Sequence, residues 1–268
     1  MAALMFTTCM LFWSTPLHRI GPKIASFRKA AKYYKQDLAD AFLALNHRFV
    51  NNLVGESEDV YSFCDPCSDQ SDENQIASNE LNFTARQNML LGTAWIALFM
   101  GDWDRGEESL NTLAKPEAAF RSSLGRSAFY FLSAMFAVAL LRQGGRNRKR
   151  YSTFRRNFRR IRELAQRCPT TFFPMQLMME AEDAARAGKF DDATNKYALT
   201  MKVASKDPAF HCEGLAAVRL GQTLDFECRN AIEAREAYVK ARTIYEAWGA
   251  NVVVDRLNNL IAEIEASR

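Results

Sequence analysis

The sequence predicts an all-α protein built as an array of helical hairpins. Only 7 prolines and 12 glycines occur in 268 residues, which is too little turn punctuation for a sheet-rich fold and suits long helices joined by short turns. Apolar residues recur three and four positions apart over most of the chain, as on the buried face of a helix. Two segments also repeat one spacing of small, glycine and aromatic residues. At this length, such a pattern favours a repeat array over a single core.

The repeated spacing begins at Leu90 and again at Leu177, which are 87 positions apart. In each segment a large apolar residue is followed four places later by alanine and, after seven more, by glycine. An aromatic residue, a small residue and a second large apolar residue come next. The matched positions are Leu90 and Leu177, Ala94 and Ala181, Gly101 and Gly188, Trp103 and Phe190, Gly106 and Ala193, and Leu110 and Tyr197.

Each position in this spacing has a structural reason. The alanine lets a second helix approach closely, and the glycine ends the first helix in the left-handed conformation. The aromatic residue is expected to fold back onto the hairpin. Asp104 and Asp191 lie where the second helix starts, because free amides and the helix dipole favour a carboxylate there. The next small residue is a helix contact point, and the last apolar residue packs inward.

More helices are expected on both sides of these segments. From Ile24 to Val54 apolar residues, among them Tyr34 and Leu38, recur at helical spacing, with a break near residues 34–37. Toward the C-terminus we expect one helix over 214–221 and another from 231 to Trp248, ended by Gly249. A last helix over 252–266 has one apolar face and is expected to cap the array.

This pattern resembles the tetratricopeptide repeat, a helix-turn-helix unit that stacks into an α-α superhelix. A more specific resemblance rests on residues 155–169, 176–193 and 234–250, the last ending in Tyr245-x-x-Trp248-Gly249-Ala250. Together these look like the helical repeat region of large multidomain predicted ATPases and signalling kinases of the STAND type. The resemblance covers roughly residues 85–262. It implies a regulatory scaffold within, or derived from, such a protein.

The resemblance does not imply catalysis by this chain. The sequence contains no G-x-x-x-x-G-K-[ST] phosphate loop and no kinase glycine loop or H-R-D motif. We therefore expect a protein-interaction module with no catalytic residue, cofactor or metal. Two alternatives stay open: a fragment of an enzyme polypeptide whose catalytic domains lie outside this chain, and a basic-surface binder of nucleic acid or lipid.

The predicted organisation has three parts: N-terminal helices over 1–54, a flexible acidic loop over 55–78, and the repeat array with its capping helix over 79–268. The first fifteen residues are mostly apolar and are either a targeting segment or a buried helix; they are too short to span a bilayer. Six scattered cysteines favour a reducing compartment, so a cytoplasmic location is expected.

Cys64 and Cys67 form the only C-x-x-C. Two thiolates at this spacing can hold zinc or exchange disulfides. Zinc would need two further ligands, and none lies nearby in the sequence. The neighbouring aspartates would raise the thiol pKa values by like-charge repulsion. A redox or metal role and a plain loop pair both remain open.

Ten Lys or Arg residues lie between Arg142 and Arg162. From residue 153 onward an apolar stripe recurs at helical spacing, so the arginines are expected on the opposite face. The side chains concerned are Arg155, Arg156, Arg159 and Arg160. This face is either a solvated surface or a dock for an acidic partner. Nucleic-acid binding is not expected, because no helix-turn-helix, zinc or RNA-binding signature accompanies the run.

Arrays of helical hairpins bind peptides or helices in the groove lined by the first helix of each hairpin. On helix position alone, the candidate groove residues are Arg126, Tyr130, Gln176 and Glu180. The expected partner is a protein or peptide, and no membrane span is expected.

Overall fold

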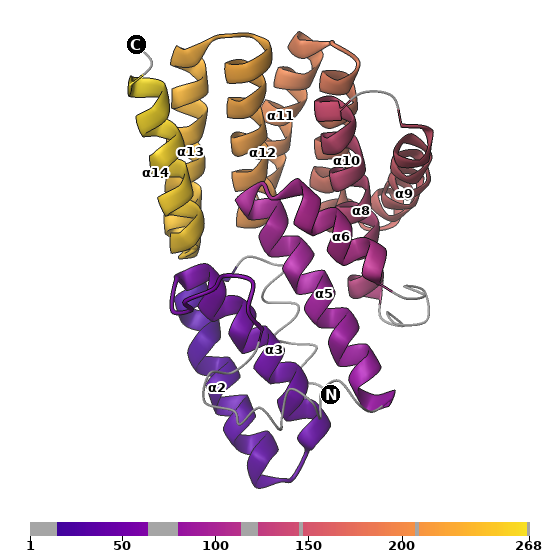
Figure 1. Cartoon of the computed structure of the whole chain (residues 1–268), viewed down its shortest axis with the longest axis vertical. Helices are drawn as coiled ribbons and strands as arrows, with labels where there is room; N and C mark the ends of the chain where they lie inside the picture. Colours follow the sequence, from indigo (N-terminus) through magenta and orange to yellow (C-terminus); the bar gives the residue numbers. More distant parts are fainter. Residues whose placement is uncertain (1–14, 64–79, 114–122, 145–146, 207–208, 267–268) are drawn as a thin grey trace.

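The computed structural model describes residues 15–63, 80–113, 123–144, 147–206 and 209–266, and every regular element in those ranges is a helix. The elements are α2 (Leu17–Tyr33), α3 (Asp37–Val54), α5 (Glu80–Met100), α6 (Trp103–Thr112), α8 (Ser123–Gly144), α9 (Arg148–Arg167), α10 (Pro169–Arg186), α11 (Phe190–Ala204), α12 (Phe210–Gln222), the π-helical segment η1 (Thr223–Glu227), α13 (Ala231–Trp248) and α14 (Asn251–Ala266). Consecutive helices pack against each other along the chain (Figure 1).

Four glycines end helices at chain reversals. Gly55, Gly101, Gly188 and Gly249 have φ angles of 93°, 69°, 74° and 88°, which only glycine adopts without strain. At each corner the following residue donates its N–H to the carbonyl five residues earlier, as in a Schellman motif. The bonds are Glu56 to Asn51, Asp102 to Ala97, Lys189 to Ala184 and Ala250 to Tyr245.

The two repeated segments form the hairpins α5–α6 and α10–α11, with their small residues at the helix contacts. Ala94, Ala181 and Ala193 are fully buried, and Gly106 lies against the ring of Phe136. The cap of α6 is Asp102, whose carboxylate accepts a hydrogen bond from the Arg105 N–H. The remaining matched positions are buried or half-buried: Leu90, Trp103, Leu110, Leu177, Phe190 and Tyr197.

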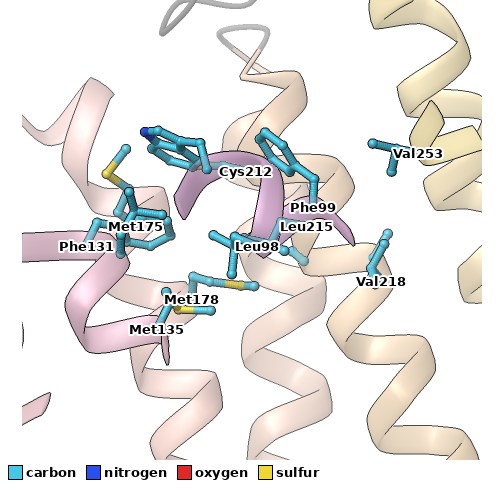
Figure 2. Packing of buried hydrophobic residues seen from close by; sticks show 14 of the residues in the cluster. Leu98, Phe99, Phe131, Met135, Met175, Met178, Cys212, Leu215, Val218 and Val253 are labelled. Carbon is cyan, nitrogen blue, oxygen red and sulfur yellow. The ribbon is translucent and has the colours of Figure 1, made fainter. Parts of the chain in front are cut away.

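The C-terminal end of α5 lies at the centre of the molecule. Trp95 contacts Phe131 of α8 and His211 of α12, with ring centroids 5.8 Å apart in both cases. Phe99 packs edge-on against Tyr245 and Trp248 of α13, at 6.1 Å and 5.6 Å. Figure 2 shows the labelled side chains of later helices around this end of α5. Helices α8, α12 and α13, which come after α6 in the chain, thus pack around the C-terminal end of α5, which comes before it.

The last described helix, α14, also contacts helices from the early part of the chain. Asn251 of α14 donates from Nδ2 to the Val54 carbonyl at the end of α3, at 3.0 Å, and the Val252 side chain lies beside Gly55. Arg256 of α14 donates from Nη1 to the Phe99 carbonyl, at 2.9 Å. The helix that was expected to cap one end of the array therefore also contacts α3 and α5 near its beginning.

Within the described ranges, one stretch, Leu124–Gly144 in α8, is long and apolar enough by composition to cross a membrane, and 67% of its most apolar window is buried inside the structure. A core helix passes the same test. The burial of α8 is accounted for by its packing against α5, α6, α9 and α10.

Two details of the N-terminal region differ from the sequence analysis. Tyr34 and Leu38, which fit the apolar spacing, are exposed, because the turn between α2 and α3 points away from every other helix. Residues 55–63, assigned to a flexible loop, are held in place: Asn52 donates to the Ser62 carbonyl at 2.9 Å, and the Tyr61 hydroxyl donates to Asp102 at 3.2 Å. Residues 1–14 and the pair Cys64 and Cys67 lie outside the described residues.

Candidate functional site

A fully buried carboxylate lies in the middle of the helix stack. Glu182 of α10 has no exposed surface, and two arginines from different helices surround it. Arg219 of α12 donates from Nε and Nη2, at 2.5 Å and 2.7 Å, while Arg142 of α8 donates from Nη1 at 3.0 Å. The Tyr197 hydroxyl of α11 adds a fourth bond at 2.7 Å. These four residues are called the Glu182 cluster below.

The arginines of the Glu182 cluster also form hydrogen bonds with residues in and next to the π-helical segment η1. Arg142 donates from Nη2 to the Thr223 hydroxyl at 3.1 Å and to Glu227 at 3.4 Å. Arg219 donates to Gln222 and its guanidinium lies 4.8 Å from the ring of Trp103. Each arginine thus has several partners, as buried charges require.

The electrostatics of the cluster keep Glu182 ionised. Burial by itself raises the pKa of Glu182, but the charges of Arg219 and Arg142 and the bonds they donate outweigh it, and the net pKa is about 2. The pKa of Tyr197 is raised by burial and by the adjacent carboxylate. A carboxylate that is permanently charged and bonded on all sides is not available as a proton donor or acceptor, so the cluster is a clamp that joins α8, α10, α11 and α12.

Sequence reasoning did not find this cluster. The sequence pattern predicts no role for Glu182 and includes Arg142 only as the start of the basic run. In the structure Arg142 lies in the core, and its side chain is 8% exposed. The available signal was Arg219, a lone charge inside the apolar stretch 214–221. Glu182 lies between Glu180 and Asp183, so its sequence neighbours gave no such signal.

The remaining basic run forms one exposed face of α9. Phe154, Asn157, Ile161 and Ala165 are buried against the stack, which leaves the charged side chains outside. The exposed cations, called the arginine face below, are Arg148, Lys149, Arg155, Arg156, Arg159, Arg160, Arg162 and Arg167.

The arginine face has little internal compensation. Helix α9 carries nine basic side chains and one glutamate, a formal charge of +8, against +4 for the whole chain, so the rest of the chain carries −4. Across the described ranges, salt bridges reach two of the nine: Arg150 with Glu107 of α6, and Arg160 with Glu163 one turn along. Arg155, Arg156 and Arg159 have no carboxylate within salt-bridge distance there.

The four candidate groove residues lie on two neighbouring helices, α8 and α10. Arg126 and Tyr130 are half-buried on α8, where the Tyr130 ring contacts Phe129. Gln176 donates to Glu180 one turn along α10, at 2.8 Å. Glu180 lines a shallow depression of about 290 Å³ together with Phe158 of α9, Lys189 and Lys196. Lys189 directly precedes α11, and Lys196 lies on it. The side chains of α10 that lie toward α5 are Met175 and Met178 (Figure 2).

Among the described residues no three His, Cys, Asp or Glu side chains are placed to share a metal ion. His211 is buried beside Trp95, and its pKa is lowered to about 4 by burial. Comparison with known proteins adds no relative: no family model matches the chain, and no curated protein matches it.

Proposed function

We propose that this chain is a tetratricopeptide-like interaction module, an α-α superhelix closed on its own α5, that binds an acidic protein segment through the arginine face of α9. It acts by binding and not by catalysis. The observation that carries the proposal is the set of exposed arginines on α9, of which only Arg160 forms a salt bridge among the described residues, with Glu163 of the same helix.

The inner side of the stack is a poor candidate for the partner site, because α5 already fills it. Trp95, Leu98 and Phe99 are 7%, 1% and 2% exposed, and Trp95 and Phe99 contact residues of α8, α12, α13 and α14. A peptide would have to displace this helix before entering. The outer face of α9 is free of that obstacle.

The spacing of the arginine face supports a binding role. Arg155 and Arg159, and Arg156 and Arg160, are four residues apart, so like charges face each other on the helix. Such pairs destabilise a helix by about 0.2–0.5 kcal/mol each. An acidic partner removes this repulsion. Arginine also presents a planar fork that grips a carboxylate with two bonds, which lysine does not.

A protein partner is favoured over single-stranded nucleic acid by the aromatic content of this face. Non-specific single-strand binding relies on exposed rings on which bases stack. The ring of Tyr151 is flanked by Arg186 and Arg155, whose guanidinium carbons lie 4.9 Å and 6.0 Å from its centroid. The face offers charged forks without a free stacking platform.

The test compares charge reversal on α9 with charge reversal elsewhere. The probe is a glutamate-rich helical peptide of about 20 residues, matching the length of α9. The variant is Arg155→Glu/Arg156→Glu/Arg159→Glu/Arg160→Glu, and we expect it to bind at least about tenfold more weakly than the wild type by fluorescence anisotropy. A pull-down with both proteins then identifies the natural partner.

A matched control reverses four exposed cations outside α9, none of them in a salt bridge with another described residue: Lys189, Lys202, Lys206 and Arg229. It changes the formal charge equally and should bind the peptide like the wild type. If both variants lost peptide affinity equally, the effect would come from net charge and not from the arginine face. The proposal of a protein partner would be wrong if the wild type bound single-stranded DNA more tightly than the peptide and only the α9 variant lost that DNA binding.

A further inference from the structure

A second surface of distinct chemistry lies at the turn between α2 and α3. Tyr33 is 79% exposed, Tyr34 69% and Leu38 46%. The two tyrosine rings are perpendicular, with centroids 5.0 Å apart. The turn lies at one end of the molecule's long axis, away from α6 to α14 (Figure 1). The turn projects from the rest of the molecule at that end (Figure 1). Its three exposed apolar side chains are called the tyrosine tip below, and exposed apolar patches mark contact sites.

The helix that leads to the tyrosine tip carries only positive charge. Helix α2 contains Arg19, Lys23, Arg28, Lys29 and Lys32 and no acidic residue. Lys29 is exposed and lies four residues before Tyr33, on the same side of α2. Lys32 is also exposed in this last turn of the helix, next to Asp40 of α3. Lys35 stands in the turn itself.

The first two turns of α3 carry two carboxylates, and one of them is paired with cations of α2. Asp40 of α3 accepts from Arg28 at 3.0 Å and lies 3.9 Å from Lys32. Asp37 occupies the first turn of α3, where its charge complements the helix dipole. The surface around the tip is therefore net basic.

The backbone of the turn is suited to a medium of low polarity. The N–H groups of Tyr34, Lys35 and Gln36 donate to the carbonyls of Ala30, Lys32 and Ala31, at 3.0, 3.1 and 2.8 Å. Amides bonded inside the protein can leave water without an unsatisfied donor. Lys35 has a φ of 51°, a conformation that glycine adopts more readily, so a lysine stands where the backbone alone would favour glycine.

We propose that the tyrosine tip is a peripheral contact for an anionic lipid bilayer. Tyr33, Tyr34 and Leu38 enter the interfacial region, where tyrosine places its ring among the acyl chains and its hydroxyl among headgroups. Lys29, Lys32 and Lys35 extend their alkyl stems along this region and bind the anionic headgroups. An apolar element combined with a basic patch supplies the two signals that stable anchoring requires.

The geometry favours a bilayer over other occupants. A projecting turn fits a deformable surface, and two perpendicular rings do not form the parallel platform on which consecutive bases stack. The proposal does not depend on the arginine face of α9, whose apolar residues are buried in the stack.

The test is co-sedimentation of the full chain with vesicles of phosphatidylcholine containing about 30% phosphatidylserine, and with vesicles of phosphatidylcholine alone. We expect binding to the anionic vesicles only. Tyr33→Ser/Tyr34→Ser/Leu38→Ser should lower the partition coefficient at least about tenfold. In Tyr34→Trp, the emission of the added indole should shift to the blue on anionic vesicles.

Two controls separate the tip from general stickiness and from α9. Phe226 of η1 and Ile232 of α13 are 69% and 63% exposed and lie outside the α2–α3 hairpin, and Phe226→Ser/Ile232→Ser should bind vesicles like the wild type. Lys35→Gly should weaken vesicle binding while leaving the melting temperature unchanged or higher, since it relieves the left-handed lysine. This opposite pair of effects excludes loss of folding as the cause.

Several results would overturn the proposal: no binding of the wild type to anionic vesicles, binding of the serine variant equal to that of the wild type, or loss of binding only when the arginine face is reversed. Binding of single-stranded DNA that is lost in the serine variant would assign the tip to nucleic acid instead. None of these outcomes affects the peptide-binding test on α9, so the two proposals fail separately.

Discussion

Arg219 of α12 holds both carboxylate oxygens of Glu182 of α10, with Nε donating to Oε1 and Nη2 donating to Oε2 at 2.7 Å. The two residues are 37 positions apart. Their pairing fixes the rotation of α10 against α12, because neither side chain can turn without leaving a buried charge uncompensated. Arg142 extends this constraint to α8.

Glu182→Gln is therefore expected to lower the free energy of unfolding by roughly 3–5 kcal/mol, because two buried arginines lose their anion. Urea denaturation followed by circular dichroism measures the change. Glu180→Gln is the control on the same helix: Glu180 is half-buried and bonded only to Gln176 among the described side chains, and its loss should change stability by at most about 0.5 kcal/mol. Equal effects of the two substitutions would contradict the clamp.

His211 predicts a dependence of stability on pH. Its pKa falls from 6.5 to about 4 on folding because of burial, so below pH 6.5 the unfolded chain binds a proton that the folded chain does not. Stability is full above pH 6.5 and is lost as the pH falls toward 4. We expect a loss of roughly 2 kcal/mol between pH 7 and pH 5, measured by urea denaturation at each pH.

His211→Leu should remove most of that loss between pH 7 and pH 5. His18→Leu, at an exposed position, should retain it. The contribution of Glu182, whose pKa is lowered from 4.5 to about 2, is present above pH 4.5 and is lost as the pH falls toward 2, so it lies in a lower window. A wild-type stability that is flat from pH 7 to pH 5 would show that the imidazole is not buried.

Gly106→Ala should destabilise the contact between α6 and α8. A Cβ at this position would lie 2.0 Å from two carbons of the Phe136 ring, and Phe136 is itself buried. Overpacking of this kind costs about 1–3 kcal/mol. Gly144→Ala has nothing within 4 Å of the added carbon and should be neutral or gain up to about 1 kcal/mol. Thermal melts of both variants decide whether α6 packs as described.

Phe99→Ala tests the central position of α5. Phe99 is 2% exposed and contacts two aromatic rings of α13, so its truncation should lower the free energy of unfolding by about 3–5 kcal/mol. Phe83 lies on the same helix but is 40% exposed. Phe83→Ala should cost at most about 1 kcal/mol. If the two substitutions cost the same in denaturant titrations, α5 does not lie inside the stack.

The helices and their corners could be predicted because their determinants are local. The spacing from Ala94 to Gly101, and from Ala181 to Gly188, places a left-handed residue after a helix, and both glycines have positive φ. Apolar spacing likewise predicted α14, where Val253, Leu257, Ile261 and Ile264 are buried.

The position of α5 and the Glu182 cluster could not be predicted in this way, because both depend on residues far apart in the chain. Phe99 meets Tyr245 only once several intervening helices have fixed the curvature of the stack. Tyr34 shows the reverse case, in which a local pattern predicts burial and the fold leaves the residue exposed. Its spacing is that of a core residue, but it lies in a turn that no other helix covers.

The bond from Arg256 to the Phe99 carbonyl joins residues separated by 157 positions. At ribosomal speeds of 5–20 residues per second, the partner of that carbonyl emerges roughly 8–30 s after it. For most of that interval the nascent α5 presents Phe99 outside the ribosome without its final neighbours Tyr245 and Trp248. Holdase chaperones bind exposed apolar surfaces of this kind. The yield of folded protein should therefore change with the speed of translation between codons 100 and 256.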